Sequence, residues 1–174
     1  SDIDILLVID GNSRKIIDSI SKLVNESQIK IGITIYSKYE FENGLVDTKT
    51  IYNLELLRKG IFYPSILNKC LRFPFFSESY RKKLHKIILP NFIHKFRRGL
   101  YNERINIIEV TKDSYNIMKF ILSINGDLVY SYEMTKDHFY NLFPNCPKIY
   151  NVHELINGKN CSKYRNKCFK FIDY

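Results

Sequence analysis

The sequence contains none of the short motifs that identify the commonest kinds of catalytic site. It has no glycine-rich phosphate loop, no nucleophile elbow and no zinc-protease motif. It also has no internal repeat and no low-complexity tract. The four histidines are scattered, with no nucleophile near any of them in the sequence. We therefore expect each histidine to be a surface or core residue rather than a catalyst.

Long apolar runs are absent as well. No stretch approaches the roughly 20 residues that a helix needs to span a bilayer, and the chain does not open with a signal-peptide pattern. We therefore expect a cytoplasmic protein that does not enter a membrane.

The few cysteines have no zinc-binding spacing. Cys70, Cys146, Cys161 and Cys168 form no C-x-x-C pair, and no H-x-x-x-H pair accompanies them. Two interpretations stay open. Cys146, His153, Cys161 and Cys168 could converge on a metal ion, or the cysteines could be buried or idle reduced thiols, as is usual in a cytosolic chain.

What is present fits a folded protein with a basic surface. The 174 residues suffice for one ordinary domain or two small ones, and 45% of them are hydrophobic against 26% charged. Lysine and arginine outnumber aspartate and glutamate by 27 to 18, which gives a net charge of +9. This surplus favours polyanionic partners such as RNA or nucleotide phosphates, although a lysine-rich proteome would give the same composition.

The first 36 residues have the pattern of a strand, a helix and a second strand. Residues 3–9 are a run of strand formers that ends at Asp10-Gly11-Asn12. Apolar residues then recur at helical spacing over 13–27, and residues 29–36 alternate between isoleucine and other residues. A crossover unit of this kind predicts two parallel or neighbouring strands in one sheet.

The remainder is mostly helical. Helices are predicted at residues 51–58, 78–89, 92–108, 111–124, 135–143 and 162–171, with Gly60 ending the first, Pro90 breaking the second and a short extended piece at 61–63. We place the boundary in the Pro- and Phe-rich stretch 71–77. The expected domains are an α/β lobe at 1–72 and a mainly helical lobe at 73–174.

The acidic opening of the first strand suggests a metal site. Asp2 and Asp4 are two residues apart, so their carboxylates should project from the same side of a strand. Two carboxylates so close repel each other unless a cation lies between them, and Mg²⁺ prefers such oxygen ligands. A pair of exposed acidic residues near a chain end is the structural alternative, but the buried strand that follows favours a functional role.

The string Ser1-Asp2-Ile3-Asp4-Ile5-Leu6-Leu7-Val8 resembles the catalytic strand of the DNA-polymerase-β-like nucleotidyltransferase superfamily, especially its minimal and aminoglycoside-modifying members. The stretches Glu40-Phe41-Glu42 and Leu56-Leu57-Arg58-Lys59-Gly60-Ile61-Phe62-Tyr63 are similar to the region that follows the second strand in that family. The likeness of the helical second half to the family's helical domain is only loose. The resemblance implies an α+β fold, with a mixed sheet, flanking helices and a helical lobe after them.

The resemblance also implies a site and a reaction. Asp2 and Asp4 would hold the catalytic metal, with two Mg²⁺ ions expected, and Ser1 would contact the nucleoside triphosphate. The protein would transfer a nucleoside monophosphate to a hydroxyl group of a small molecule, a protein or a tRNA, through positioning and charge neutralisation.

Two features depart from the family pattern. The family has a Gly-Ser pair shortly before this strand, whereas this sequence starts at Ser1, so we expect it to be an incomplete piece of a longer protein. The family also places a third acidic residue on the next core strand. Here the polar face of that strand offers Lys30, Gly32, Thr34 and Tyr36. The missing carboxylate leaves open a degenerate relative that binds nucleotide, RNA or a partner protein without chemistry.

Basic residues gather in the first part of the helical lobe. They are Arg81, Lys82, Lys83, Lys86, His94, Lys95, Arg97 and Arg98, interleaved with tyrosines and phenylalanines. This segment could dock an RNA backbone, or it could be the solvated face of helices whose other face is buried. A plain basic RNA-binding module, with an incidental pair of aspartates, is a third interpretation of the chain.

Overall fold

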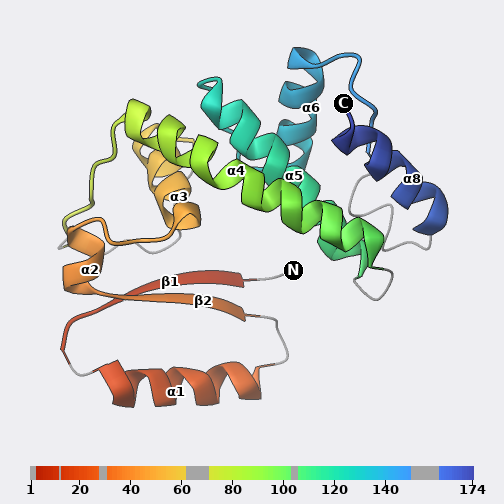
Figure 1. Cartoon of the computed structure of the whole chain (residues 1–174). Coiled ribbons are helices and arrows are strands. Elements are labelled where there is room, and N and C mark those ends of the chain that lie inside the picture. The colour runs from red at the N-terminus through yellow and green to blue at the C-terminus, as the bar shows by residue number, and fades with distance from the viewer. Residues whose placement is uncertain (1–2, 12, 28–30, 62–70, 103–105, 150–160) are drawn as a thin grey trace. The chain divides into compact units, whose positions relative to one another are not determined.

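The computed structural model describes residues 3–11, 13–27, 31–61, 71–102, 106–149 and 161–174 (Figure 1). In this part the protein is α+β, with seven helices and a two-stranded parallel sheet. Its contacts define two compact units, Ser1–Leu54 with Pro64–Phe76 and Glu55–Tyr63 with Ser77–Tyr174. The expected domain limits at 1–72 and 73–174 stay a prediction, because such units are defined by contacts and not by independent folding.

The first unit is built on the expected crossover. Strand β1 (Ile3–Ile9) leads through helix α1 (Ser13–Glu26) into strand β2 (Ile31–Ser37). The two strands are parallel and in register, from Ile3 opposite Ile31 to Ile9 opposite Ser37. Figure 1 shows α1 running along one side of the sheet. The prediction of a parallel strand–helix–strand unit is confirmed.

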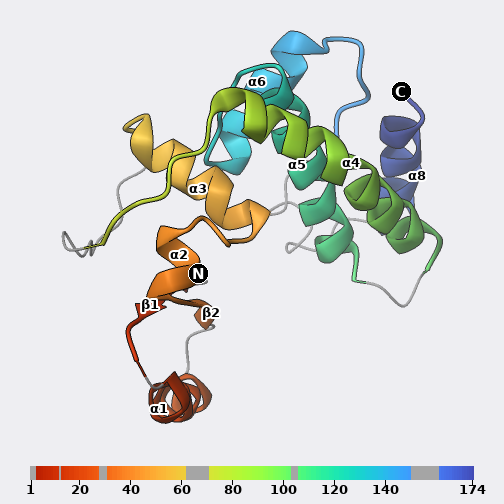
Figure 2. The same ribbon diagram turned by 60° about the vertical axis from the view of Figure 1, so that its left-hand side comes forward.

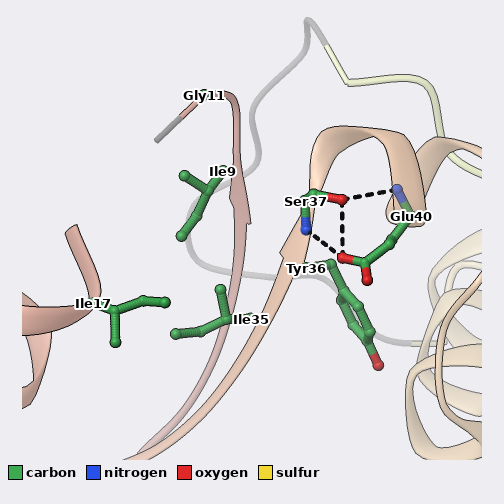
Figure 3. Close-up of a pocket in the computed structure, with 7 residues that line it drawn as sticks. All are labelled: Ile9, Gly11, Ile17, Ile35, Tyr36, Ser37 and Glu40. Carbon is green, nitrogen blue, oxygen red and sulfur yellow. Dashed lines mark hydrogen bonds between the residues drawn. The ribbon is translucent and has the colours of Figure 1, made fainter. Parts of the chain in front are cut away.

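The alternation of residues gives this sheet two different faces. Register partners in a parallel pair point to the same side, so the isoleucines of β2 share a face with the odd-numbered residues of β1. On that face Ile9 and Ile35 lie toward Ile17 of α1 (Figure 3). The even-numbered residues of β1, Asp4 among them, therefore lie on the face away from α1.

Two helices follow β2. Helix α2 (Lys38–Glu42) begins with a capping box, in which Ser37 accepts a hydrogen bond from Glu40 N and the Glu40 carboxylate accepts one from Ser37 N. The sequence analysis missed α2, although the spacing Ser37-x-x-Glu40 is the pattern of that box. Helix α3 (Thr48–Arg58) begins three residues earlier than expected, because Asp47 accepts a hydrogen bond from Thr50 N at 2.7 Å and caps it.

The second unit is a helical assembly. It contains α4 (Glu78–Tyr101), α5 (Ile107–Ile124), α6 (Tyr132–Leu142) and α8 (Cys161–Ile172). Helix α5 packs against α4, α6 and α8, and Figure 2 shows α4 and α5 side by side. Their shared core includes the fully buried side chains of Phe96, Tyr115, Met118 and Tyr164. None of the helices in the described ranges has the length and apolar character that a membrane crossing requires.

Three expected helix limits are wrong. Pro90 does not break the chain into two helices, since α4 continues through it. Proline costs a helix interior about 3 kcal/mol, but Leu89 and Phe92 on either side pack against the core and hold the helix together. Helix α4 then ends at Tyr101, well before residue 108, and α5 begins at Ile107 instead of Thr111, because Asn106 caps it.

The remaining expectations agree with the structure or lie outside it. The helices expected at 135–143 and 162–171 are present as α6 and α8, with limits shifted by one to three residues. Of the extended piece expected at 61–63, residues 62 and 63 lie outside the described residues.

Candidate functional site

Asp4 is the predicted site residue that the structure describes. It lies near the start of β1 and its side chain is exposed over 70% of its surface, so the carboxylate is open to ligands from solution. Asp2 and Ser1 lie outside the described residues. The expected pairing of the two aspartates therefore stays a prediction.

The strand beside Asp4 has no carboxylate to complete a metal site. Gly32 lies opposite Asp4 in the register, and Thr34 and Tyr36 follow on the same face. Lys30, the other residue expected on this face, lies outside the described residues. The register partner of Asp4 therefore contributes no side chain to this face of the sheet.

A lysine from another element reaches Asp4. Lys49 lies in the first turn of α3, and its Nζ is 3.1 Å from Asp4 Oδ2. The Lys49 side chain is 66% exposed. An ion pair this exposed is worth only about 0.2–1 kcal/mol, so it does not prevent a divalent cation from replacing the ammonium group. Sequence reasoning missed Lys49, because nothing local connects residues 45 positions apart.

Beyond Lys49, the start of α3 is held to the same face of the sheet by a hydrogen-bonded cluster. The Tyr36 hydroxyl donates to Asp47 Oδ2 at 2.8 Å and accepts from Asp47 N at 2.9 Å. Partial burial raises the pKa of the Asp47 carboxyl, but hydrogen bonds from Thr50, Tyr36 and Lys49 outweigh burial and lower it. The Asp47 carboxylate is thus occupied in capping α3 and anchoring Tyr36.

The two glutamates after β2 are also engaged elsewhere. Glu40 accepts from both Ser37 N and Ser37 Oγ, and these bonds lower the pKa of its carboxyl. Glu42 Oε1 accepts from Arg72 N at 3.2 Å. Neither glutamate supplies the third acidic ligand of the family pattern.

An open pocket of about 260 Å³ lies at the carboxyl ends of the strands (Figure 3). Its walls are largely apolar, from Ile9, Ile17 and Ile35, and its polar side chains include Ser37 and Glu40. Since these two polar groups bond to each other in the capping box, they are poorly placed to bind a ligand. The pocket does not include Asp4.

The described residues contain no group of three or more His, Cys, Asp or Glu side chains placed to hold a metal ion. Of the alternative cysteine site, Cys146 and Cys168 are buried free thiols, and burial raises the pKa of each to about 11. Such thiols stay protonated and unreactive near neutral pH. His153 and the side chain of Cys161 lie outside what the structure describes.

A buried polar cluster lies in the second unit. Arg81 on α4 donates from Nη1 to the Ser123 carbonyl at 3.0 Å and also to the Ser123 hydroxyl, and His85 Nδ1 lies 2.7 Å from that hydroxyl. All three side chains are fully buried. Burial, reinforced by the charge of Arg81, lowers the pKa of His85 to about 4. His85 is thus a core residue, one of the two locations expected for the histidines.

A second histidine contact in the described part of the chain involves a partly exposed side chain. His138 Nδ1 on α6 lies 2.5 Å from Asp127 Oδ2, and both side chains are about two-fifths exposed. No serine, threonine or cysteine nucleophile is hydrogen-bonded to this pair among the contacts of the described residues. The pair therefore has the geometry of a partly exposed hydrogen bond between side chains.

Comparisons with known proteins neither support nor contradict the family resemblance. No family model, no curated protein and no solved structure matches this chain.

Proposed function

We propose that the protein is a Mg²⁺-dependent nucleotidyltransferase that moves a nucleoside monophosphate from a nucleoside triphosphate to a hydroxyl acceptor. The supporting observation is the exposed Asp4 carboxylate at the start of a parallel strand–helix–strand unit. Asp2, two residues earlier, would supply the second carboxylate. The proposal includes the nucleotidyltransferase fold, with its mixed sheet, for this chain.

The residues around Asp4 fit a hard divalent cation. The carboxylate is exposed, its register partner Gly32 has no side chain, and among the described residues the one cation in contact with it is a weakly held lysine. Asp2 and Asp4 would hold the Mg²⁺ ions, which would neutralise charge on the phosphates and on the leaving pyrophosphate. Lys49, once released from Asp4, would lie close enough to attract the triphosphate.

In the proposed reaction the acceptor oxygen forms a bond to the α-phosphorus, and the bond from that phosphorus to the β-phosphate oxygen breaks. Pyrophosphate leaves with the electron pair, and the hydroxyl proton has to be removed. The described face of β2 offers no carboxylate as a base, so we expect the proton to pass to water. Loss of a positioned base typically lowers a rate about 10²–10⁴-fold, which predicts a slow enzyme.

The missing third carboxylate also supports a second candidate function. A relative that has lost catalysis would bind a nucleoside triphosphate and keep it intact. Gly32 opposite Asp4, and a lysine paired with Asp4, are the observations that favour this alternative. It differs from the first in one measurable respect, since nucleotide binding would occur without release of pyrophosphate.

A transfer assay with α-³²P-labelled nucleoside triphosphates tests the proposal. The purified protein is incubated with Mg²⁺, with total RNA or polyhydroxylated small molecules as acceptors, and labelled product and pyrophosphate are measured. Asp4→Asn should abolish transfer. Asp10→Asn is the matched control, because this exposed aspartate follows the same strand about 20 Å away.

The outcomes are distinct. Transfer by the parent protein and the Asp10→Asn variant, with loss in Asp4→Asn, supports the enzyme. Equal transfer in both variants contradicts it. Mg²⁺-dependent nucleotide binding without pyrophosphate release supports the degenerate relative instead.

A further inference from the structure

The exposed face of α4 carries a charge of one sign. Between Ser79 and Asn102 the sequence has seven lysine and arginine residues and no aspartate or glutamate. Three of the seven are accounted for within the fold. Arg81 is buried against Ser123, Lys82 pairs with Glu78 at 2.8 Å, and Lys95 pairs with Asp113 at 2.7 Å.

The other four cations form what we call the α4 basic face, namely Lys83, Lys86, Arg97 and Arg98. Each is exposed, and none has an ion-pair partner within the described ranges. At about 100° per residue the four positions fall within about 120° around the helix axis, and at about 1.5 Å per residue Lys83 and Arg97 are about 21 Å apart. The α4 basic face is therefore a stripe along one side of the helix.

The opposite side of α4 is buried along most of the helix. Arg81, His85, Phe96 and Leu100 are buried, and Phe92 packs against the core between them. Because one side of α4 is packed against the rest of the unit, only the other side of the helix is open to a partner, and Figure 2 shows α4 lying alongside α5. A helix in this position is unsuited to entering the major groove of B-form DNA, which receives a protruding helix.

The same burial argues against a membrane surface as the partner. A helix that lies in a bilayer interface buries an apolar side and keeps its charged side toward water and headgroups. In α4 the apolar side is already used by the core, and the large apolar side chains that are exposed, Tyr80, Ile87 and Tyr101, lie far apart along the helix. The α4 basic face can therefore attract a partner mainly through its positive charges, and a row of cations along a helix suits a regular array of phosphates.

We infer that the α4 basic face binds the phosphate backbone of an A-form RNA duplex across its wide, shallow minor groove. Base stacking contributes little, because the exposed tyrosines near the two ends of the helix, Tyr80 and Tyr101, are about 31 Å apart. The binding is thus expected to depend on RNA shape and charge and not on sequence. It does not rest on the proposed transferase activity.

Two variants of equal net charge distinguish RNA binding at the α4 basic face from general attraction of RNA to a positively charged protein. The α4 variant carries Lys83→Gln, Lys86→Gln, Arg97→Gln and Arg98→Gln. The matched control carries Lys15→Gln, Lys22→Gln, Lys148→Gln and Lys170→Gln, four exposed lysines outside α4. Each variant loses four positive charges, so the net charge changes from +9 to +5 in both. Circular dichroism and thermal unfolding establish that both are folded.

Binding is measured by fluorescence anisotropy with a labelled 20-base-pair RNA duplex, over a series of salt concentrations and without nucleotide. For four phosphate contacts the slope of log K against log salt should be about −3 to −4 in the parent protein. The α4 variant should lose at least about 30-fold in affinity and most of that slope. The control should keep both within about threefold.

Several results would overturn the inference. Failure of the parent protein to bind RNA would do so, as would the same loss of affinity in the two variants. Equal affinity for a B-form DNA duplex of the same length would also contradict it, as would tighter binding to phosphatidylserine vesicles than to RNA. Because nucleotide is absent, failure here leaves the transferase proposal untouched, and an inactive Asp4→Asn protein should still bind the duplex.

Discussion

Lys49 at the start of α3 holds its ammonium nitrogen 3.1 Å from Asp4 Oδ2 on β1, across 45 residues of sequence. Both side chains are largely exposed. A divalent cation that bound the Asp4 carboxylate would have to compete with this ammonium group. The contact therefore links the stability of the first unit to the chemistry proposed for it.

Replacing Lys49 with glutamine should separate these two roles. An exposed ion pair contributes little, so the free energy of unfolding should change by less than about 1 kcal/mol. Removal of a competing positive charge should raise the affinity for Mn²⁺ in the absence of nucleotide. Urea denaturation and isothermal calorimetry measure the two effects, with Lys22→Gln as the control. A fall in Mn²⁺ affinity would show that the lysine does not compete at Asp4.

The buried His85 predicts a pH dependence of stability. An unfolded histidine has a pKa near 6.5, whereas burial lowers the pKa of His85 to about 4 in the native protein. Between these values the unfolded chain binds more protons than the native one, so stability falls as the pH falls through this window. We expect His85 to account for about 1–2 kcal/mol of lost stability between pH 7 and pH 5.

Urea denaturation of the parent protein and of His85→Gln at both pH values measures this contribution. The variant should be less stable at pH 7, because it disturbs the packing around Ser123, but its stability should depend less on pH. The exposed His94 offers a control for the substitution itself, since its side chain lies outside the buried cluster around Ser123. An identical pH dependence in His85→Gln and the parent protein would refute a buried neutral imidazole.

Replacing Pro90, which lies inside α4, should make the protein more stable. It lies inside α4 and its side chain is exposed, so it contributes an interrupted hydrogen bond and little packing. Pro90→Ala should increase the free energy of unfolding by about 1–3 kcal/mol. Asn91→Ala, at the neighbouring exposed position, should increase it by less than about 1 kcal/mol. Both are measured by urea denaturation, and a destabilised Pro90→Ala protein would mean that the proline itself makes a necessary contact.

These examples show what local sequence pattern can predict. The alternation over residues 29–36 and the apolar run at 3–9 specify strands, and the intervening helix requires them to be parallel. Pro90 misled the prediction because propensity is local, while the core contacts of Leu89 and Phe92 come from the whole second unit. Helix α2 was not predicted because five residues are too few to show a helical periodicity. Its capping box, Ser37-x-x-Glu40, is nevertheless recognisable in the sequence.

The candidate site was predictable only in part. Asp4 is visible in the sequence because an acidic residue interrupts a strand of apolar residues. Its contact with Lys49 depends on where α3 begins relative to β1, and Asp47 and Tyr36 fix that position through long-range hydrogen bonds. The contacts of Arg81 and His85 with Ser123 likewise join residues about 40 positions apart in sequence, on two different helices.

The most direct test of the central claim is whether the Asp4 carboxylate binds a divalent cation. Mn²⁺ electron paramagnetic resonance is recorded with a non-hydrolysable ATP analogue for the parent protein, Asp4→Asn and Asp10→Asn. We predict saturable Mn²⁺ binding in the parent protein and in Asp10→Asn, and at least about a tenfold weaker affinity in Asp4→Asn. Equal Mn²⁺ affinity in all three proteins would contradict the account.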